Sequence, residues 1–227
     1  MRFAGIQSLS LLDFPGRPCA ILFTQGCVFR CPYCHNPDLI PTGEGGYAEE
    51  EILARLEKRR AMVDAVCITG GEPTLHPDLV PFLRRLKAAG FAVKLDTNGV
   101  HPRVVETVLC ERLADYLAMD LKHVWERYAD VTRVAAVQAR DNCLESFRLI
   151  QGSGVPHEFR TTIAPGIHAL DDFTTMAGYL RPGETYAVQS FRAGKTLAAD
   201  LPQAGFDAAA VVQLLRPLFP SLNLEAR

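Results

Sequence analysis

The strongest constraint on the fold is a repeated pattern, in which a short apolar run is followed by a polar motif and then by an amphipathic segment. Six apolar runs have the length of buried strands, at residues 19–24, 65–69, 91–95, 116–119, 158–163 and 186–189. Helical patterns follow them at 48–60, 79–89, 103–113, 135–151, 171–180 and 207–218. Strands that alternate with helices are typical of a parallel sheet with helices outside it.

The number of repeats favours an incomplete barrel. A full eight-unit barrel typically has about 250 residues, whereas six units occur here in 227. We therefore expect an α/β fold, an open partial (β/α)6 TIM-like barrel of parallel strands, in a single domain over residues 1–227. We expect an irregular or hairpin-like segment at 1–18, a loop at 37–47, and a last helix that closes the chain.

Composition places the chain among ordinary soluble globular proteins, because 48% of its residues are hydrophobic and 22% are charged. The formal net charge of −2 gives no general reason to bind nucleic acid or an anionic membrane. No secretion signal is evident, and no apolar run is long enough to span a bilayer. We expect a cytoplasmic protein, in which cysteines stay reduced.

Three of the seven cysteines, Cys27, Cys31 and Cys34, stand close together directly after the first apolar run. This spacing predicts a metal site with one vacant position. A structural zinc site needs four ligands, usually as two pairs, and no second pair occurs, although adjacent His35 is a candidate. In a cubane iron–sulfur cluster, three irons would bind cysteine and the fourth would bind something else. We expect the remaining cysteines to be small buried residues: Cys19, Cys67, Cys110 and Cys143.

Polar motifs follow the later strands, at the edge where the active sites of barrels and open α/β sheets are built. They are Gly70-Gly71-Glu72-Pro73, Asp96-Thr97-Asn98-Gly99, Asp120-Leu121-Lys122 and Gln189-Ser190-Phe191-Arg192. In the first, two glycines would let backbone approach a ligand closely, and Glu72 could accept hydrogen bonds from an ammonium group. Taken singly, each motif also has a plain structural interpretation as a turn or a surface pair.

Arg160 stands inside the fifth apolar run. Alternation places it with Thr162 on one face and Phe159 with Thr161 on the other. An inward arginine would be costly without an anionic partner. That partner is either a bound ligand or a carboxylate, from Glu158 or from a neighbouring strand.

The string Cys27-x-x-x-Cys31-x-Tyr33-Cys34 resembles the signature of the radical S-adenosylmethionine (SAM) superfamily. Continued through His35-Asn36-Pro37, it resembles the activating enzymes of glycyl radical enzymes, most of all the group that activates anaerobic ribonucleoside-triphosphate reductase. The resemblance extends over nearly the whole chain. It implies that the three cysteines hold a 4Fe-4S cluster, whose fourth iron binds the amino and carboxylate groups of SAM. Residues 35–66 contain no cysteine, so we expect one cluster only.

The resemblance also implies roles for the strand-end residues. It assigns active-site roles to Asp120 and Lys122, and it places a monovalent cation near Asp96, Thr97 and Asp120. The residues that it implies for binding the cofactor are Tyr33, Gly70, Gly71, Glu72, Pro73, Asp96, Thr97, Asn98, Arg160 and Gln189.

The function that this resemblance implies is reductive cleavage of SAM and use of the resulting 5′-deoxyadenosyl radical to form a glycyl radical on anaerobic ribonucleotide reductase. A flavodoxin- or ferredoxin-type protein would supply the electron. One alternative is activation of another glycyl radical enzyme, and another is a synthase acting on a small molecule, similar to 7-carboxy-7-deazaguanine synthase. Outside the enzymes, an iron–sulfur electron carrier or a zinc-stabilised binding module remains, but both need four protein ligands.

Overall fold

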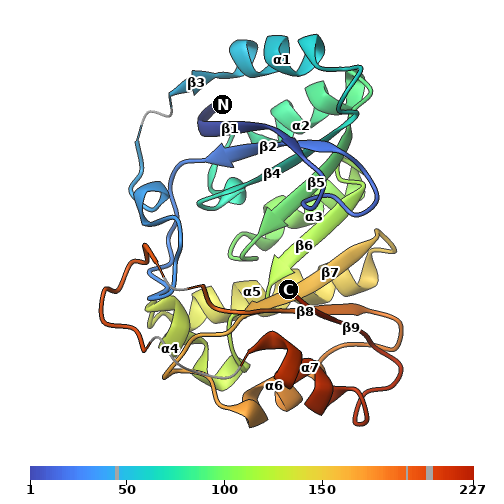
Figure 1. Ribbon diagram of the computed structural model, residues 1–227. Coiled ribbons are helices and arrows are strands. Elements are labelled where there is room, and N and C mark those ends of the chain that lie inside the picture. Colours follow the sequence, from blue (N-terminus) through green and yellow to red (C-terminus); the bar gives the residue numbers. More distant parts are fainter. Residues whose placement is uncertain (44–45, 193, 203–206) are drawn as a thin grey trace.

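The computed structural model of the protein describes residues 1–43, 46–192, 194–202 and 207–227. These residues form one curved nine-stranded sheet in the order β3-β1-β2-β4-β5-β6-β7-β8-β9 (Figure 1). The strands are β1 (Arg2–Ser10), β2 (Cys19–Thr24), β3 (Tyr47–Ala48), β4 (Ala65–Gly70), β5 (Ala92–Thr97), β6 (Tyr116–Asp120), β7 (His157–Thr162), β8 (Thr185–Gln189) and β9 (Asn223–Ala226). From β2 onward along this order, every pairing is parallel. The expected fold class is confirmed.

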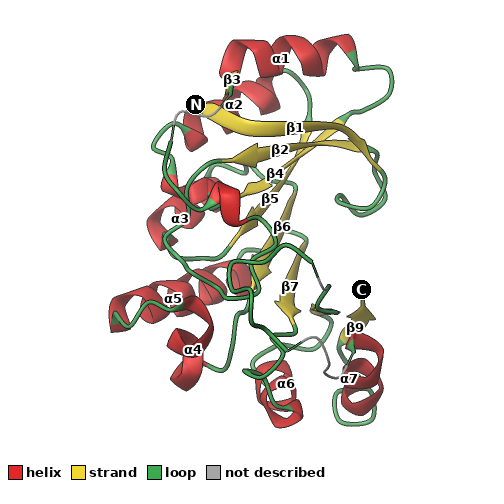
Figure 2. Cartoon of the chain, turned by 60° about the vertical axis from the view of Figure 1, so that its left-hand side comes forward, coloured by secondary structure: helices red, strands yellow, loops and turns green. Residues whose placement is uncertain are grey.

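Helices lie along the outer side of the curved sheet (Figure 2). They are α1 (Glu49–Lys58), α2 (Leu79–Ala88), α3 (Pro102–Cys110), α4 (Tyr128–Thr132), α5 (Val137–Gly152), α6 (Leu170–Ala177) and α7 (Ala208–Leu215), with short 3-10 turns η1 (Pro37–Leu39), η2 (Pro73–Leu75) and η3 (Trp125–Arg127). No helix in the described ranges is long and apolar enough to cross a membrane.

Apolar side chains between the sheet and the helices form the core. In α2, the stripe Leu79, Phe82, Leu83 and Leu86 is fully buried against Val93 and other side chains of the sheet's outer face. Burying each such side chain stabilises the fold by about 1.5–3 kcal/mol. This stripe follows the helical periodicity of the sequence, and therefore α2 was predictable to within one residue.

Three strands were missed by the sequence pattern. The hairpin-like start is confirmed, because β1 pairs with β2 in antiparallel fashion, but β1 is a strand of nine residues. The two-residue strand β3 pairs with β1 and forms the edge of the sheet. The expectation that a helix closes the chain is wrong, because β9 pairs in parallel with β8. All three strands lie at or next to an edge of the sheet. Fewer of their side chains are buried there, so the alternation of apolar and polar residues is weak. Of the loop expected at 37–47, residues 44–45 lie outside the described residues, and Pro37–Leu39 form η1.

The inner face of the barrel differs from the outer face because it carries charge. Alternation along β5 points Lys94 and Asp96 inward, and both are buried. Near the amino ends of the strands, a small apolar cluster around Phe14, Cys19 and Cys67 fills the interior. The polar side chains therefore gather toward the carboxyl ends. Of the cysteines expected to be buried, Cys110 is exposed at the end of α3, because it stands in the last turn, beyond the covered stripe.

Candidate active site

A cavity of about 220 Å³ lies at the carboxyl ends of the strands. It brings together almost all of the residues that the sequence motifs single out. The cysteine loop, residues 26–36 between β2 and η1, contributes Cys27, Cys31, Tyr33 and Cys34. The later strand ends contribute Gly70, Gly71, Glu72, Asp96, Thr97, Asn98, Asp120, Lys122 and Arg160. Pro73 and Gln189 do not line it.

The cysteine loop is held by backbone hydrogen bonds to segments that are distant in sequence. The amide of Gly26 donates to the carbonyl of Leu39 at 2.7 Å, and the amide of Arg30 donates to Thr132 at 2.9 Å. The amide of Leu197 donates to the carbonyl of Cys34 at 3.1 Å. The loop is therefore fixed on three sides, by η1, by the end of α4 and by the segment after β8.

The three thiols fit a cluster better than a single ion. Within the described ranges, no three His, Cys, Asp or Glu side chains are placed to hold one metal ion. A single-ion zinc site needs such convergence, whereas in a cubane cluster each cysteine binds a different iron. His35 is occupied elsewhere, since its Nε2 lies 2.8 Å from the carbonyl oxygen of Arg192. The zinc interpretation therefore lacks a converging fourth ligand among these residues.

Burial keeps the thiols of Cys27 and Cys31 neutral in the structure. It raises the pKa of Cys27, and it raises the pKa of Cys31 to about 12. A metal would have to displace these protons, because the thiolate is the ligand. Tyr33 also lines the cavity, and its hydroxyl is buried without a hydrogen-bond partner among the described residues. Such an orphaned polar atom marks a place where a bound molecule would supply the partner.

The cysteine loop requires the two glycines at the end of β4, Gly70 and Gly71. In the parallel register Thr24 lies opposite Gly70, so the chain leaving β2 passes directly over the end of β4. A Cβ atom on Gly71 would lie 2.1 Å from the carbonyl oxygen of Gly26, and Gly70 has a φ of +115°. The amide of Glu72 donates to that same Gly26 carbonyl at 2.8 Å. The close approach expected for a ligand is thus made by the protein's own backbone.

The carboxylate of Glu72 is fully buried and receives four donors. Its Oε1 accepts from the amide and hydroxyl of Thr74 and from the hydroxyl of Thr97, the last at 2.7 Å. Its Oε2 accepts from the amide of Asn98 at 2.6 Å. Burial raises the pKa of Glu72, and these hydrogen bonds partly offset the effect. Glu72 therefore ties the end of β4 to the end of β5, and a ligand's ammonium group would have to share its oxygens.

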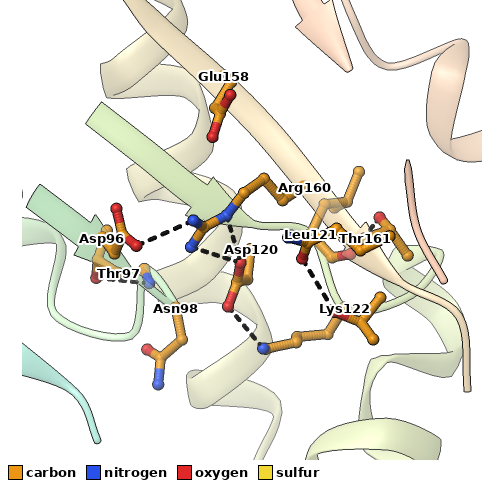
Figure 3. Close-up of polar contacts among 12 residues, drawn as sticks. Asp96, Thr97, Asn98, Asp120, Leu121, Lys122, Glu158, Arg160 and Thr161 are labelled. Atoms are coloured by element: carbon orange, nitrogen blue, oxygen red, sulfur yellow. Dashed lines mark hydrogen bonds and ion pairs between the residues drawn. The ribbon is translucent and has the colours of Figure 1, made fainter. Parts of the chain in front are cut away.

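Five charged side chains from β5, β6, β7 and the residues after β6 form a continuous chain of ion pairs. Its part from Asp96 through Arg160 and Asp120 to Lys122 lines the cavity floor and is drawn in Figure 3. Its order is Lys94, Asp96, Arg160, Asp120 and Lys122. Arg160 donates to Asp96 at 2.9 Å and to Asp120 at 3.0 Å, and Lys122 donates to Asp120 at 2.8 Å. We call these five residues the charge chain. Every carboxylate oxygen in it has a cationic partner from the protein.

The ionisation of the charge chain follows from these contacts. Burial alone would raise the pKa of Asp120, but the ion pairs with Lys122 and Arg160 outweigh it and lower that pKa to about 2. The pKa of Asp96 is lowered in the same way by Arg160 and Lys94, again against its burial. Burial would lower the pKa of Lys122, but Asp120 keeps it well above its usual value. All five groups are therefore charged at neutral pH.

The partner of Arg160 was one of the alternatives open from the sequence. It proves to be carboxylates of neighbouring strands, Asp96 and Asp120. Glu158 lies apart from them in Figure 3 and instead pairs with Arg227 at 2.6 Å. The guanidinium nevertheless lines the cavity, so a ligand can approach it there. The expected alternation is confirmed, since Phe159 and Thr161 are buried on the opposite face.

Two residues that organise the cavity, Lys94 and His168, are absent from the sequence-based prediction. Lys94 stands two positions before Asp96, so period two from that motif places it on the same inward face. His168 donates from Nε2 to the carbonyl of Lys122 at 2.8 Å, while its Nδ1 accepts from the amide of Ala164 at 2.9 Å. Since it follows β7 in an irregular loop, no periodicity points to it. His168 holds the backbone from which Lys122 reaches the cavity.

The side chain of Gln189 contacts Thr162 and does not line the cavity. Its side-chain oxygen accepts from the hydroxyl of Thr162 at 3.1 Å, and Thr162 itself lines the cavity. Pro73 is buried at the start of η2, where a proline suits the first helical position. Both residues therefore support the cavity from behind its wall.

Comparison with known proteins agrees with this geometry. Residues 21–176 match the model of the family described as the radical SAM superfamily. A Methanocaldococcus jannaschii protein assigned by name to the glycyl-radical enzyme activating enzymes is 35% identical over 191 residues, 83% of this chain and 79% of that protein. The pyruvate formate-lyase-activating enzyme of Clostridium pasteurianum is 35% identical over 129 residues, 54% of this chain and 53% of that enzyme.

The fold is also that of a solved structure. Streptococcus suis SuiB bound to its precursor peptide SuiA superimposes with a TM-score of 0.73 at 12% identity, covering 91% of this chain and 48% of SuiB. The chain thus spans about half the length of SuiB and of the Clostridium enzyme. Together, the matched family, the relatives and the cavity show that this chain belongs to the radical SAM superfamily and, within it, to the glycyl-radical enzyme activating enzymes.

Proposed function

We propose that the protein activates anaerobic ribonucleoside-triphosphate reductase by reductive cleavage of SAM at a 4Fe-4S cluster held by Cys27, Cys31 and Cys34. One observation supports this above all: a single cavity joins three buried or half-buried thiols to polar groups from four successive strand ends. The function of an electron carrier, a zinc module or a disulfide protein does not require these polar groups beside the thiols. The choice of ribonucleotide reductase as the protein substrate rests on the resemblance of residues Gly26 to Pro37 to the enzymes that activate that reductase.

The chain's residues would divide the work as follows. The three cysteines would bind the cluster as thiolates, while Asn98, whose Nδ2 lies 3.8 Å from Cys27 Sγ, would orient that ligand. When bound, the cluster and SAM supply one-electron reduction and a carbon-centred radical. Lys122 and Arg160 offer cationic groups to the carboxylate of SAM. Gly70, Gly71 and Glu72 would form the rim that receives its ammonium group, and Pro73 would support that rim from behind.

The remaining cofactor contacts would exclude water from the radical. We assign Tyr33 to the wall beside SAM, where its unpartnered hydroxyl can donate to a ligand oxygen. Thr97 and Asp96 would lie under the amino acid part of SAM, and Gln189 would reach the adenosine or the protein substrate through Thr162. Asp120 holds Lys122 in place by the 2.8 Å ion pair.

A monovalent cation near Asp96, Thr97 and Asp120 belongs to the same proposal. It would require one carboxylate oxygen to exchange a protein cation for the ion, because each is already paired. Activity assayed with potassium, with sodium and with a bulky organic cation checks this. Equal rates in all three would remove the cation from the proposal.

The proposed chemistry also implies a cellular location, an electron donor and a protein substrate. We propose a single radical SAM domain over residues 1–227 that works in the cytoplasm with a flavodoxin- or ferredoxin-type electron donor. Its protein substrate would present a glycine-bearing loop at the mouth of the cavity, and an open barrel leaves room for a peptide. Neither nucleic acid nor a membrane has a part in this proposal.

The test has two stages. Protein reconstituted without oxygen should bind about four irons and, once reduced, cleave SAM to methionine and 5′-deoxyadenosine. Absence of cleavage would rule out every radical SAM activity. Mixing with anaerobic ribonucleotide reductase should then give the doublet of a glycyl radical in electron paramagnetic resonance.

A second candidate substrate is pyruvate formate-lyase, because the activating enzyme of that protein in Clostridium pasteurianum is among the relatives. The same spectroscopic experiment, run with each enzyme in turn, decides between them by the yield of radical. Cleavage of SAM with no radical on either protein would favour a small-molecule synthase.

A further inference from the structure

A second concave surface lies on the outer side of the cysteine loop. It is a groove of about 430 Å³, lined among others by Arg30, Pro32, Arg133, Pro165 and Leu197. Its walls come from the cysteine loop, from the residue after α4, from the turn after β7 and from the segment after β8. We call it the outer groove.

The outer groove and the cavity share no lining residue in the described part of the chain. The cysteine loop separates them: Arg30 and Pro32 line the groove, while Cys31 between them lines the cavity. A peptide in the groove would therefore have the loop between itself and the reacting atoms. An electron has no such restriction, because it can pass through a ligand residue to the cluster.

The groove is positively charged at the cysteine loop. Arg30 and Arg133 are both exposed, and neither forms an ion pair with a carboxylate in the parts of the chain that the structure describes. The Nη1 of Arg30 donates to the carbonyls of Cys27 and Phe29, which holds its guanidinium against the cysteine loop. Asp200 is the only acidic residue among the described lining residues. Exposed arginines without carboxylate partners suit a negatively charged partner, by steering it and fixing its orientation.

The backbone presents Arg133 by an unusual conformation. Arg133 has a φ of +57° and ends α4 in the left-handed region, which residues other than glycine adopt at a cost. The preceding carbonyl, of Thr132, accepts from the amide of Arg30 at 2.9 Å. This hydrogen bond joins the end of α4 to the loop, so the two arginines stand on connected backbone.

We propose that the outer groove is the docking surface for the electron donor, an acidic protein that carries a reduced flavin or iron–sulfur group. This inference rests on the proposed function. One electron would pass from the reduced donor to the cluster that Cys27, Cys31 and Cys34 would hold, and no bond would form between the two proteins. A small, charge-steered contact is typical of electron-transfer pairs, which dissociate quickly.

The experiment compares two reductants on the reconstituted enzyme. Dithionite is a small molecule that needs no docking surface, whereas reduced flavodoxin must dock. We expect Arg133→Glu to leave dithionite-driven SAM cleavage unchanged and to raise the apparent KM for reduced flavodoxin by about tenfold. The salt dependence of the flavodoxin reaction should become weaker. Arg133→Gln removes the charge without reversing it and should give a smaller shift in the same direction.

The matched control is Arg148→Glu, which changes an exposed arginine on α5 outside the groove and should behave as wild type. An unchanged KM for flavodoxin in Arg133→Glu, with wild-type cleavage by dithionite, would overturn the inference alone. Loss of cleavage by dithionite in the wild-type protein would instead overturn the proposed function. If Arg133→Glu forms less glycyl radical with dithionite as reductant, the groove receives the protein substrate and the inference is wrong.

Discussion

The two walls of the cavity are built in opposite ways. The charge chain on β5, β6 and β7 is complete without any ligand, because each carboxylate oxygen is paired with a protein cation. The cysteine loop is fixed by backbone hydrogen bonds, yet its thiols have almost no polar partners. One wall is organised by its own side chains, and the other is organised only in its backbone.

The difference shows that the wall of paired charges is preorganised, whereas the thiols of the other wall await a cofactor. Paired charges on three neighbouring strands are positioned by the sheet register, in which Asp120 lies directly beside Arg160. Thiols with raised pKa values keep their protons until a metal takes them. Loss of the cluster should therefore leave the floor intact, whereas loss of one floor charge should disturb the apoprotein itself.

The sharpest way to test the cysteine wall is Cys31→Ala. We expect loss of the reconstituted cluster and a fall in SAM cleavage of at least about a thousandfold, since one of the three ligands is gone. The charge chain should survive, so the unfolding midpoint of the apoprotein should stay close to wild type. The control is Cys110→Ala, at an exposed cysteine outside the cavity, for which wild-type iron content is expected. Normal iron content in Cys31→Ala would contradict the ligand assignment.

Arg160→Met tests the floor. It leaves the buried carboxylate of Asp96 and the partly buried one of Asp120 short of their shared partner, so the free energy of unfolding of the apoprotein should fall by about 3–5 kcal/mol. Arg84→Met is the matched control, because Arg84 makes an exposed double hydrogen bond to Glu111 at 2.7 Å and should lose about 1 kcal/mol or less. Denaturant titration measures both. Equal losses in the two variants would mean that the charge chain is no more than a surface network.

Gly71→Ala tests the place where the two walls meet. Its Cβ would stand 2.1 Å from the Gly26 carbonyl, so the start of the cysteine loop has to move. We expect a loss of about 1–3 kcal/mol in stability together with lower iron content. Gly152→Ala meets no atom within 4 Å and serves as control. A Gly71→Ala protein with full stability would show that the loop does not depend on this contact.

The smallest effect is expected from the support behind Lys122. Burial lowers the pKa of His168 to about 4, below its ordinary value near 6.5, so the folded state binds fewer protons than the unfolded state between these pH values. This contribution is complete above pH 6.5 and decreases as the pH falls toward 4. By pH 5.5 the loss is about 1 kcal/mol.

His168→Gln should make the decline in stability shallower, measured by denaturant titration at pH 7 and pH 5.5. It should not abolish the decline, because burial also lowers the pKa of His123 beside it. An unchanged pH slope in His168→Gln would contradict the role of His168 in this titration.

Much of this arrangement was predictable from local pattern. Strands β2, β4, β5, β6, β7 and β8 are buried on at least one face, so their apolar runs are visible in the sequence, and polar motifs at their ends had to meet at one edge. Lys94 was recoverable from the same period-two rule that placed Arg160 inward. Strand β9, the residue sequence Asn-Leu-Glu-Ala, is mostly exposed, and pattern alone does not distinguish it from loop.

By itself, the sequence determined the fold class, the three cysteines proposed as cluster ligands and the edge of the sheet on which the polar motifs lie, because these depend on spacing along the chain. Only the tertiary structure decided how the polar groups pair. Arg160 bridges Asp96 and Asp120, Glu72 binds the protein's own donors, and Gly71 admits the backbone of Gly26. These contacts join residues on different strands, and the sheet register and twist that bring them within hydrogen-bonding distance are properties of the folded chain.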